Sequence, residues 1–333
     1  MMQTAQIANQ NTHIAQTASI ESMWEINNRD FLAQADRLTM NDYDMLRALL
    51  SGIENDDSYA TSAAYYLMTC RKGLWIYKQE DMFMIFGWHP NVTGQILIFN
   101  PLQNKATPLL QSLAHAFPAP PAGIIVARVQ NNNDAIGHQV QEAILDWVYP
   151  VQTLLTHDVT EHKGTRFRDL RKNLYRVDSH NISLKPLQEH KEFMDAMSLI
   201  TGWSESREDD NYKLDDLSDP QVYILKLLRL YPSSFEGFAL YNEGRIAGVC
   251  IWEKSNRETI TSFVSVTRPD LRGMSDYIIF KMCQQLQAQG ATKVCIGGSE
   301  SAGLDAFKRK FNPVHSLNLQ TFSVSALKTA QAA

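Results

Sequence analysis

The segment GGSESAGLDAFKRKF, residues 297–311, contains residue types that serve either structure or chemistry. Its glycine pair follows the apolar run TKVCI, and glycines there permit positive φ angles and a close approach of the backbone at Gly297, Gly298 and Ser299 to a bound molecule. The same pair is common in turns from a strand into a helix. Taken alone, the spacing favours the turn and leaves a binding role open.

A second candidate is LRGMSDY, residues 271–277, between a predicted strand and a predicted helix. A helix N-terminus offers unpaired N–H groups and the positive end of a dipole, which suit a pyrophosphate or carboxylate, and Gly273 lets the backbone approach it. Arg268 and Arg272 can add charge-assisted hydrogen bonds to the same anion. The alternative is an ordinary turn in which Ser275 is the N-cap.

The segment KGTRFRDLRKNLYR, residues 163–176, is strongly basic in a chain of net charge −5. As a helix it would pack through Phe167, Leu170 and Leu174 and expose its cations on the other side. The segment has a single acidic residue, Asp169. Its basic residues are Lys163, Arg166, Arg168, Arg171, Lys172 and Arg176. The segment is therefore either a solvated helix face or a contact for phosphates.

Acidic residues gather in TGWSESREDDNYKLDD, where Glu205 or Asp209 could remove a proton from an attacking amine. The alternative is a solvated acidic loop. The sequence has no GxSxG motif and no cysteine and histidine pair recognisable as a nucleophile with its base. Their absence favours a mechanism without a covalent enzyme intermediate. No HExxH motif or His/Cys cluster at ligand spacing is present, so we expect no metal.

The elements that must position these residues follow a similar order in both halves of the chain. In the first half we expect a helix at 39–52, strands at 62–69, 73–79, 81–89 and 93–100, a helix at 107–117, a strand at 122–129 and a helix at 135–148. In the second, a hairpin around Asn242-Glu243-Gly244-Arg245 precedes a strand at 259–266, a helix at 275–290, a strand at 292–298, a helix at 301–311 and a strand at 317–324.

Length and composition indicate the number of domains and the class of protein. With 333 residues, two domains are expected, at 21–150 and 151–325, with a disordered tail at 1–20 and a frayed one at 326–333. Hydrophobic content of 44% and charged content of 20% are typical of a soluble globular protein. Four scattered cysteines, no apolar run of membrane-spanning length and no secretory signal predict a cytoplasmic protein without a membrane span.

The order of basic helix, hairpin, strand, RxGxS helix, strand, GG and FK helix resembles the acyltransferase fold of the GNAT superfamily. Within it, KGTRFRDLRKN followed by ISLK, and GMSDYIIFKMCQQLQAQGATKVCIGGSESAGLDAFKRKF, are similar to segments of the tandem-GNAT group. That group holds the Fem-type peptidoglycan aminoacyltransferases and the phosphatidylglycerol lysyltransferase C-terminal (DUF2156) family. The resemblance implies an α+β fold of two GNAT-like domains in tandem, each a mixed, mostly antiparallel sheet flanked by helices.

The resemblance also implies transfer of an aminoacyl or acyl group from an activated carrier to an amine or hydroxyl. In Fem-type enzymes the donor is aminoacyl-tRNA and the lysine of the FK pair lies at the reaction centre; that role would fall on Lys308, next to Phe307. Direct attack on an ester builds negative charge on the carbonyl oxygen, which Lys308 or N–H groups near Gly297 and Gly298 can stabilise. The residues expected to bind the donor or its phosphates are Arg166, Arg168, Arg171, Lys172, Arg272, Gly273 and Ser275.

Two other functions stay open on the sequence. One is an acyl-CoA-dependent N-acyltransferase that uses the turn from Arg272 to Asp276, although Met274-Ser275 stands where the GNAT coenzyme A loop, Q/R-x-x-G-x-G/A, has a second glycine. The other is a non-catalytic, GNAT-derived binding module. We expect no bound cofactor, because tRNA or a coenzyme A or carrier-protein thioester would act as a co-substrate. The sequence identifies neither the acceptor nor the oligomeric state.

Overall fold

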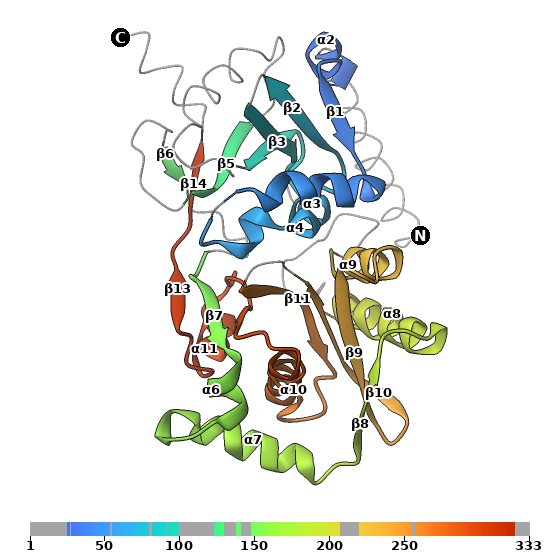
Figure 1. Ribbon diagram of the computed structural model, residues 1–333, viewed down its shortest axis with the longest axis vertical. Helices are drawn as coiled ribbons and strands as arrows, with labels where there is room; N and C mark the ends of the chain where they lie inside the picture. The colour runs from blue at the N-terminus through green and yellow to red at the C-terminus, as the bar shows by residue number, and fades with distance from the viewer. Residues whose placement is uncertain are drawn as a thin grey trace, which may run out of the picture. The chain divides into compact units, whose positions relative to one another are not determined.

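Two seven-stranded sheets organise the chain in the computed structural model, one in each of two compact units (Figure 1). The structure describes residues 25–26, 28–53, 55–79, 82–90, 92–99, 123–129, 138–140, 148–206, 220–254 and 258–323. The first unit comprises residues 1–53, 65–142 and 319–333, and the second residues 54–64 and 143–318. Each unit thus includes a short segment remote in sequence from the rest of it.

The sheet of the first unit has the strand order β1-β2-β3-β4-β5-β14-β6. Only β4 and β5 pair in parallel among these strands. A capping box in which Thr39 and Asp42 bond to each other's backbone begins the helical segment. The elements of this unit are α2 (Arg29–Leu32), β1 (Ala35–Leu38), η1 (Met40–Asp42), α3 (Tyr43–Ser51), α4 (Ala63–Thr69, which begins in the second unit), β2 (Leu74–Gln79), β3 (Met82–Trp88), β4 (Gln95–Phe99), β5 (Gly123–Val129), β6 (His138–Val140) and β14 (Gln320–Ser323).

Two predictions for this unit are wrong. The run at 62–69 forms helix α4 instead of a strand, because a short run that is buried on nearly every side has no periodicity that separates a helix from a strand. Residues His138–Val140, expected within a helix, form strand β6 and pair with β14. The helix predicted at 107–117 lies outside the described residues.

The sheet of the second unit has the order β13-β7-β12-β11-β10-β9-β8, and only β11 and β12 pair in parallel among its strands. The turn between β9 and β10 has positive φ at Glu243 and Gly244, as in a type I′ hairpin. The elements are η2 (Ser58–Thr61), β7 (Val151–Leu155), α6 (Thr156–Glu161), η3 (Thr165–Phe167), α7 (Arg168–Asp178), β8 (Ile182–Pro186), α8 (His190–Glu205), α9 (Pro220–Leu230), β9 (Phe235–Asn242), β10 (Arg245–Glu253), β11 (Thr259–Thr267), α10 (Met274–Ala288), β12 (Lys293–Cys295), α11 (Ala302–Arg309) and β13 (His315–Leu317).

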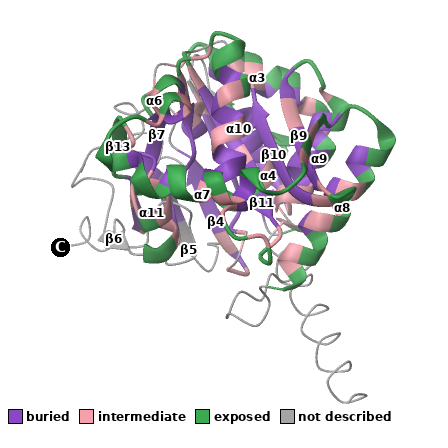
Figure 2. Ribbon diagram, turned by 90° about the horizontal axis from the view of Figure 1, so that it is seen from below, coloured by how far each residue is buried: buried purple, intermediate pink, exposed green. Residues whose placement is uncertain are grey.

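Helices cover both faces of this second sheet. Helix α10 packs on one face, with α7 beside it, and α8 and α9 cover the other face (Figure 1). On the α10 side a continuous core joins Leu170 and Leu174 of α7, Ile278 of α10 and Trp252 of β10. Figure 2 shows α10 and the strands largely buried and the outer side of α7 exposed. The predicted packing stripe of the basic segment is therefore confirmed.

The parallel pair β11 and β12 stays together over only three residue pairs. The last is Thr261 with Cys295, after which β11 continues to Thr267 while the chain after β12 turns away. Ile296 and Gly297 instead exchange backbone hydrogen bonds with Gln152, at 2.9 and 3.1 Å. The glycine pair therefore lies where two parallel strands separate.

Candidate functional site

Lys308 points back from α11 to the glycine turn. Its helix begins after Ser301, whose hydroxyl accepts a hydrogen bond from the Leu304 amide at 3.3 Å. The half-buried Lys308 side chain donates from Nζ to the carbonyl oxygen of Gly298. The helix and the turn, both singled out by the sequence, thus meet through this lysine.

Gly297 allows two polar side chains to approach the backbone closely. Its φ of +75° is a left-handed conformation that favours glycine. A Cβ added at this position would lie 3.0 Å from the Tyr59 hydroxyl and 3.6 Å from Lys308 Nζ. The glycine therefore both makes the turn and leaves space in which these two groups converge.

Tyr59 is a residue of this site that sequence reasoning missed. It belongs to η2, where the buried Asp57 accepts the Tyr59 amide at 3.2 Å. The Tyr59 side chain is buried, its hydroxyl donates to the carbonyl oxygen of Ser262, and its ring meets Phe263 edge to face at 5.3 Å. Ser262 is the first residue of β11 beyond the pairing with β12, so Tyr59 lies at the point of separation. No local motif marks it.

Two further polar side chains accompany this cluster. Ser62 donates a 2.5 Å hydrogen bond to the buried carboxylate of Glu253 and thereby attaches the segment after η2 to β10. Ser299 is fully buried, and its backbone carbonyl accepts the Tyr149 amide at 2.9 Å. Among the described residues its hydroxyl has no hydrogen-bond partner. Donors and acceptors thus surround the glycine turn.

The N-terminus of α10 is closed by α7. Gly273, with φ +92°, is the N-cap, so the alternative expectation of Ser275 in that position is wrong. A Cβ on Gly273 would lie 2.9 Å from the carbonyl oxygen of Asn173. In the first turn, the amide of Met274 donates to Leu271, and those of Asp276 and Tyr277 donate to Gly273. The amides of Met274 and Asp276, two of the donors that a helix N-terminus ordinarily leaves unpaired, are therefore engaged.

Asp276 joins the three segments that the sequence singled out. Its carboxylate is 5% exposed and accepts a hydrogen bond from Asn173 of α7 at 3.1 Å. Lys310, just after α11, lies 2.6 Å from its other oxygen. Lys310 Nζ also sits 4.2 Å from the centre of the Phe307 ring, which meets Phe311 edge to face. Phe307 thus lies against the core beside this ion pair.

The cations of the basic segment fall into two groups. Arg166 pairs with Asp158 at 2.9 Å, and Arg171 donates to the carbonyls of His162 and Gly164 at 2.5 and 2.8 Å. Arg168 and Lys172 of this segment, and Arg272 of the turn before α10, are exposed and make no hydrogen bond or ion pair with the part of the chain that the structure describes. Arg168, Lys172 and Arg272 are therefore open to an external anion.

Two of the remaining predicted residues, Glu205 and Ser275, belong to other helices than Lys308. Glu205 is the exposed last residue of α8, and Asp209 lies outside the described residues. Ser275 is exposed, and its hydroxyl lies 2.9 Å from that of Thr267. The predicted roles of Glu205, Asp209 and Ser275 as base and donor ligand stay predictions.

The cysteines are buried thiols. All four are buried, and none of them forms a disulfide. Burial raises the pKa of the Cys283 thiol to about 12, and burial likewise raises the pKa of Cys250. A thiol with a raised pKa is a poor nucleophile at neutral pH. The buried cysteines therefore pack as small apolar residues.

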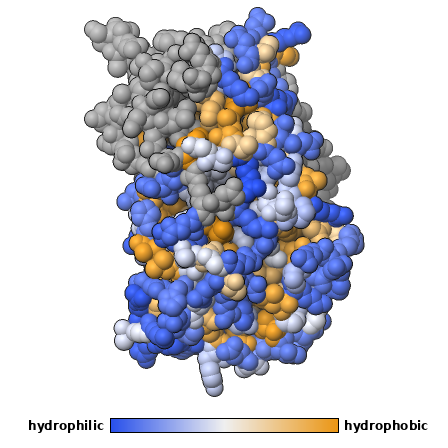
Figure 3. Space-filling view, viewed as in Figure 1, coloured by the Kyte–Doolittle hydropathy of each residue, from blue (hydrophilic) through white to orange (hydrophobic). Residues whose placement is uncertain are grey.

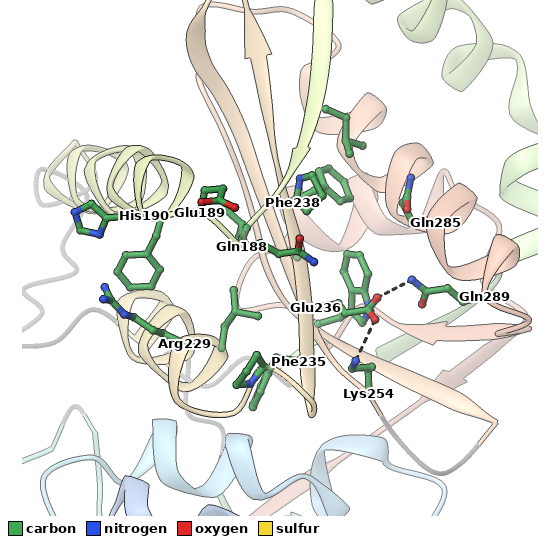
Figure 4. Close-up of a pocket in the computed structure, with 18 residues that line it drawn as sticks. Gln188, Glu189, His190, Arg229, Phe235, Glu236, Phe238, Lys254, Gln285 and Gln289 are labelled. Carbon is green, nitrogen blue, oxygen red and sulfur yellow. Dashed lines mark hydrogen bonds and ion pairs between the residues drawn. The ribbon is translucent and has the colours of Figure 1, made fainter.

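A cavity of about 750 Å³ opens beside the end of β9 (Figure 4). On its wall, the carboxylate of Glu236 accepts a 2.6 Å hydrogen bond from Gln289 and pairs with Lys254 at 3.1 Å. None of the site residues predicted from the sequence lines it. The cavity is thus distinct from the residues that the motifs bring together.

Among the described residues, none of the helices has the length and apolar composition needed to cross a membrane. The same residues include no cluster of three or more histidine, cysteine, aspartate or glutamate side chains suited to a metal.

Comparison with known proteins gives one family. A family model described as phosphatidylglycerol lysyltransferase, C-terminal, matches residues 51–321. No curated protein matches the chain by sequence. The match covers both compact units and includes the basic segment and the FK helix. The family resemblance inferred from those motifs is confirmed.

Solved structures share the fold at low sequence identity. A conserved protein of unknown function from Bacteroides thetaiotaomicron VPI-5482 is 14% identical, with a TM-score of 0.66, over 87% of this chain and 98% of its own. L-PGS from Bacillus licheniformis is 13% identical, with a TM-score of 0.58, over 87% and 94%. FemX is 11% identical, with a TM-score of 0.55, over 90% and 98%. The predicted fold, α+β with two GNAT-like units in tandem, is confirmed.

Proposed function

The chain belongs to the phosphatidylglycerol lysyltransferase C-terminal family, and from this premise we propose that it transfers an aminoacyl group from aminoacyl-tRNA to an amine or hydroxyl acceptor. The observation that carries the proposal is the position of Lys308 Nζ. It lies at the carbonyl of Gly298, beside the turn at Gly297 and close to the Tyr59 hydroxyl. A cation and a hydroxyl beside bare backbone suit a reaction that develops negative charge on oxygen.

The proposed reaction is a direct attack without an enzyme-bound intermediate. The acceptor nitrogen or oxygen attacks the carbonyl carbon of the donor ester, and the C=O π electrons move to oxygen. Lys308 turns from the Gly298 carbonyl to donate to this oxyanion. When the carbonyl re-forms, the ester C–O bond breaks, and the carrier oxygen leaves with its electron pair and takes up the proton that the acceptor loses. Glu205 and Asp209 are the proposed relays for that proton.

The geometry at α10 favours a tRNA carrier over coenzyme A. A pyrophosphate bound by backbone N–H groups needs an open helix N-terminus. At α10 the backbone of Asn173 covers Gly273, and the amides of Met274 and Asp276 donate to nearby carbonyls. Arg168, Lys172 and Arg272 have no hydrogen bond or ion pair within the described residues, and they offer side-chain contacts to a phosphate backbone instead. An acyl-CoA-dependent reaction remains the alternative.

Donor consumption by the purified full-length chain tests the proposal. The donors are a pool of radiolabelled aminoacyl-tRNAs and, separately, acetyl-CoA; the acceptors are phosphatidylglycerol in mixed micelles and a mixture of small amines. We expect label to pass from tRNA to one acceptor. Consumption of acetyl-CoA alone would establish the coenzyme A alternative, and consumption of neither donor would favour a non-catalytic binding module.

A matched pair of lysine variants assigns the chemistry. Lys308→Ala should lower the transfer rate about 100- to 1,000-fold, as loss of one oxyanion donor does elsewhere. Lys226→Ala removes an exposed lysine of α9 and should leave the rate unchanged. Both proteins should keep the wild-type unfolding midpoint within experimental error. Full activity of a folded Lys308→Ala protein would contradict the assigned role.

A further inference from the structure

The outer face of α7 carries an exposed aromatic ring between cations. Arg168, Lys172 and Tyr175 lie at positions i, i+4 and i+7, on the side of the helix opposite its buried Leu170 and Leu174. Tyr175 is 80% exposed, the largest exposure among the described large hydrophobic residues. Such exposure of a large ring is unusual unless the ring has a partner. We call this set, with Arg272, the α7 face.

The cations of the α7 face have no internal role in the described part of the chain. Arg171 and Arg176 are occupied, the first by two carbonyls and the second by Asn173 at 2.9 Å. Arg168, Lys172 and Arg272 are exposed and unpaired there. Folding therefore uses one group of cations and leaves the other to solvent or to a ligand.

A hollow of about 690 Å³ lies beside Tyr175. Its other walls come from the end of α7 and from the turn before α10, including His180 and Arg272. The nearby Asp270 is neutralised by Arg268, whose Nε lies 3.0 Å from its carboxylate. An aromatic ring, two basic groups and an open hollow thus occur together on one surface.

We propose that the α7 face binds an unpaired nucleotide segment of RNA, with Tyr175 stacking on a base and Arg168, Lys172 and Arg272 contacting phosphates. Stacking on an exposed aromatic ring, flanked by phosphate contacts, is the common way in which proteins hold single-stranded RNA. The inference rests on the proposed function in that this RNA would be the carrier of the aminoacyl group. It adds the surface and the form of the RNA that this surface accepts.

An anionic membrane is the competing partner for a basic surface with an aromatic ring. Insertion into a membrane interface needs a broad apolar face beside the cations. The α7 face presents one ring, and the exposed acids Asp169 and Asp178 lie on the same helix. The surface over α6 and α7 is mostly hydrophilic in Figure 3. One stacked base requires only the single ring that is present.

Binding of uncharged RNA to the full-length chain tests the inference without any transfer step. The probes are a fluorescent tRNA with its single-stranded 3′ end, a blunt RNA duplex of similar length, and phosphatidylglycerol vesicles. Tyr175→Ala should weaken tRNA binding about 5- to 100-fold with an unchanged salt slope, because stacking releases no counterions. Tyr175→Phe, which keeps the ring, should bind nearly as the wild type does.

The cations should change the salt dependence instead. Arg168→Gln with Lys172→Gln should lower the slope of log affinity against log salt by about 1.4, two phosphate contacts to a single strand. The matched control, Lys226→Gln with Arg245→Gln, removes two exposed cations elsewhere in the same unit and should leave the slope within about 0.3 of wild type.

Three outcomes would overturn the inference: unchanged tRNA affinity in Tyr175→Ala, an equal loss of affinity for the blunt duplex, or a Tyr175-dependent gain of vesicle binding in place of RNA binding. Its failure can be told from failure of the proposed function. Tyr175-dependent RNA binding without transfer refutes only the proposed function, whereas transfer with unaltered binding in Tyr175→Ala refutes only this inference.

Discussion

Lys310 Nζ lies 2.6 Å from the carboxylate of Asp276, and this ion pair ties the end of α11 to the first turn of α10. Asp276 is 5% exposed at its side chain and Lys310 26%. Asn173 of α7 holds the other carboxylate oxygen. The helix that carries Lys308 is therefore fixed by a largely buried contact two residues beyond that lysine.

Replacing Asp276 by Asn should lower the free energy of unfolding by about 1.5–3 kcal/mol, the usual contribution of a hydrogen bond to a charged group. The substitution keeps the shape but removes the charge that Lys310 faces. Urea unfolding followed by circular dichroism measures the loss. Lys293→Gln is the control, because it breaks the more exposed pair with Glu258, and should lower stability by less than about 1 kcal/mol. Equal losses in the two variants would show that burial of Asp276 contributes nothing.

Replacing Gly273 by Ala tests the closed N-terminus of α10. A non-glycine residue at φ +92° is strained by about 1–2 kcal/mol, and the new Cβ would also lie 2.9 Å from the Asn173 carbonyl oxygen. Gly244→Ala isolates the first effect, since Gly244 has φ +78° and nothing within 4 Å of an added Cβ. The unfolding midpoint should fall further for Gly273→Ala than for Gly244→Ala. Similar shifts of the unfolding midpoint in the two variants would mean that α7 moves to make room for the methyl group.

How much of this site could be predicted depends on where its residues lie in the sequence. Lys308 and Gly297 belong to one short motif, so their meeting was open to prediction. Tyr59 was not, because its partner Ser262 lies 203 residues away and only the folding of the second unit brings them together. Asp276 lay inside a predicted helix, yet both of its partners come from other elements. Local periodicity indicates which face of a helix is buried but not which side chain it meets there.

A double-mutant cycle tests the convergence of Tyr59 on Gly297. Gly297→Ala should lower stability through its φ of +75° and by displacing the Tyr59 hydroxyl, 3.0 Å from the new methyl group. In a Tyr59→Phe background the hydroxyl is gone, so the second effect vanishes. Gly297→Ala should then lower the free energy of unfolding by a smaller amount. We expect a coupling of about 0.5–3 kcal/mol in chemical unfolding, as for residues in contact. If the losses of unfolding free energy were additive, the Tyr59 hydroxyl would not lie against the methyl group added at Gly297.

Cys283 should make stability fall at alkaline pH. Burial raises its folded-state pKa to about 12, while the pKa of a cysteine in an unfolded chain is about 8.5. Between these values the unfolded chain loses a proton that the folded chain keeps, so the free energy of unfolding declines as pH rises, by about 1.4 kcal/mol per pH unit for this thiol. Lysines and tyrosines also titrate in this window. The contribution of the thiol is therefore the difference in the pH dependence of the unfolding free energy between wild type and Cys283→Ala. The variant should be less stable at pH 7, through loss of a buried side chain, and should lose less stability between pH 9 and about 11. The same pH dependence in both proteins would show that the thiol reaches solvent, and rapid reaction of the native wild-type protein with a thiol reagent would support that result independently.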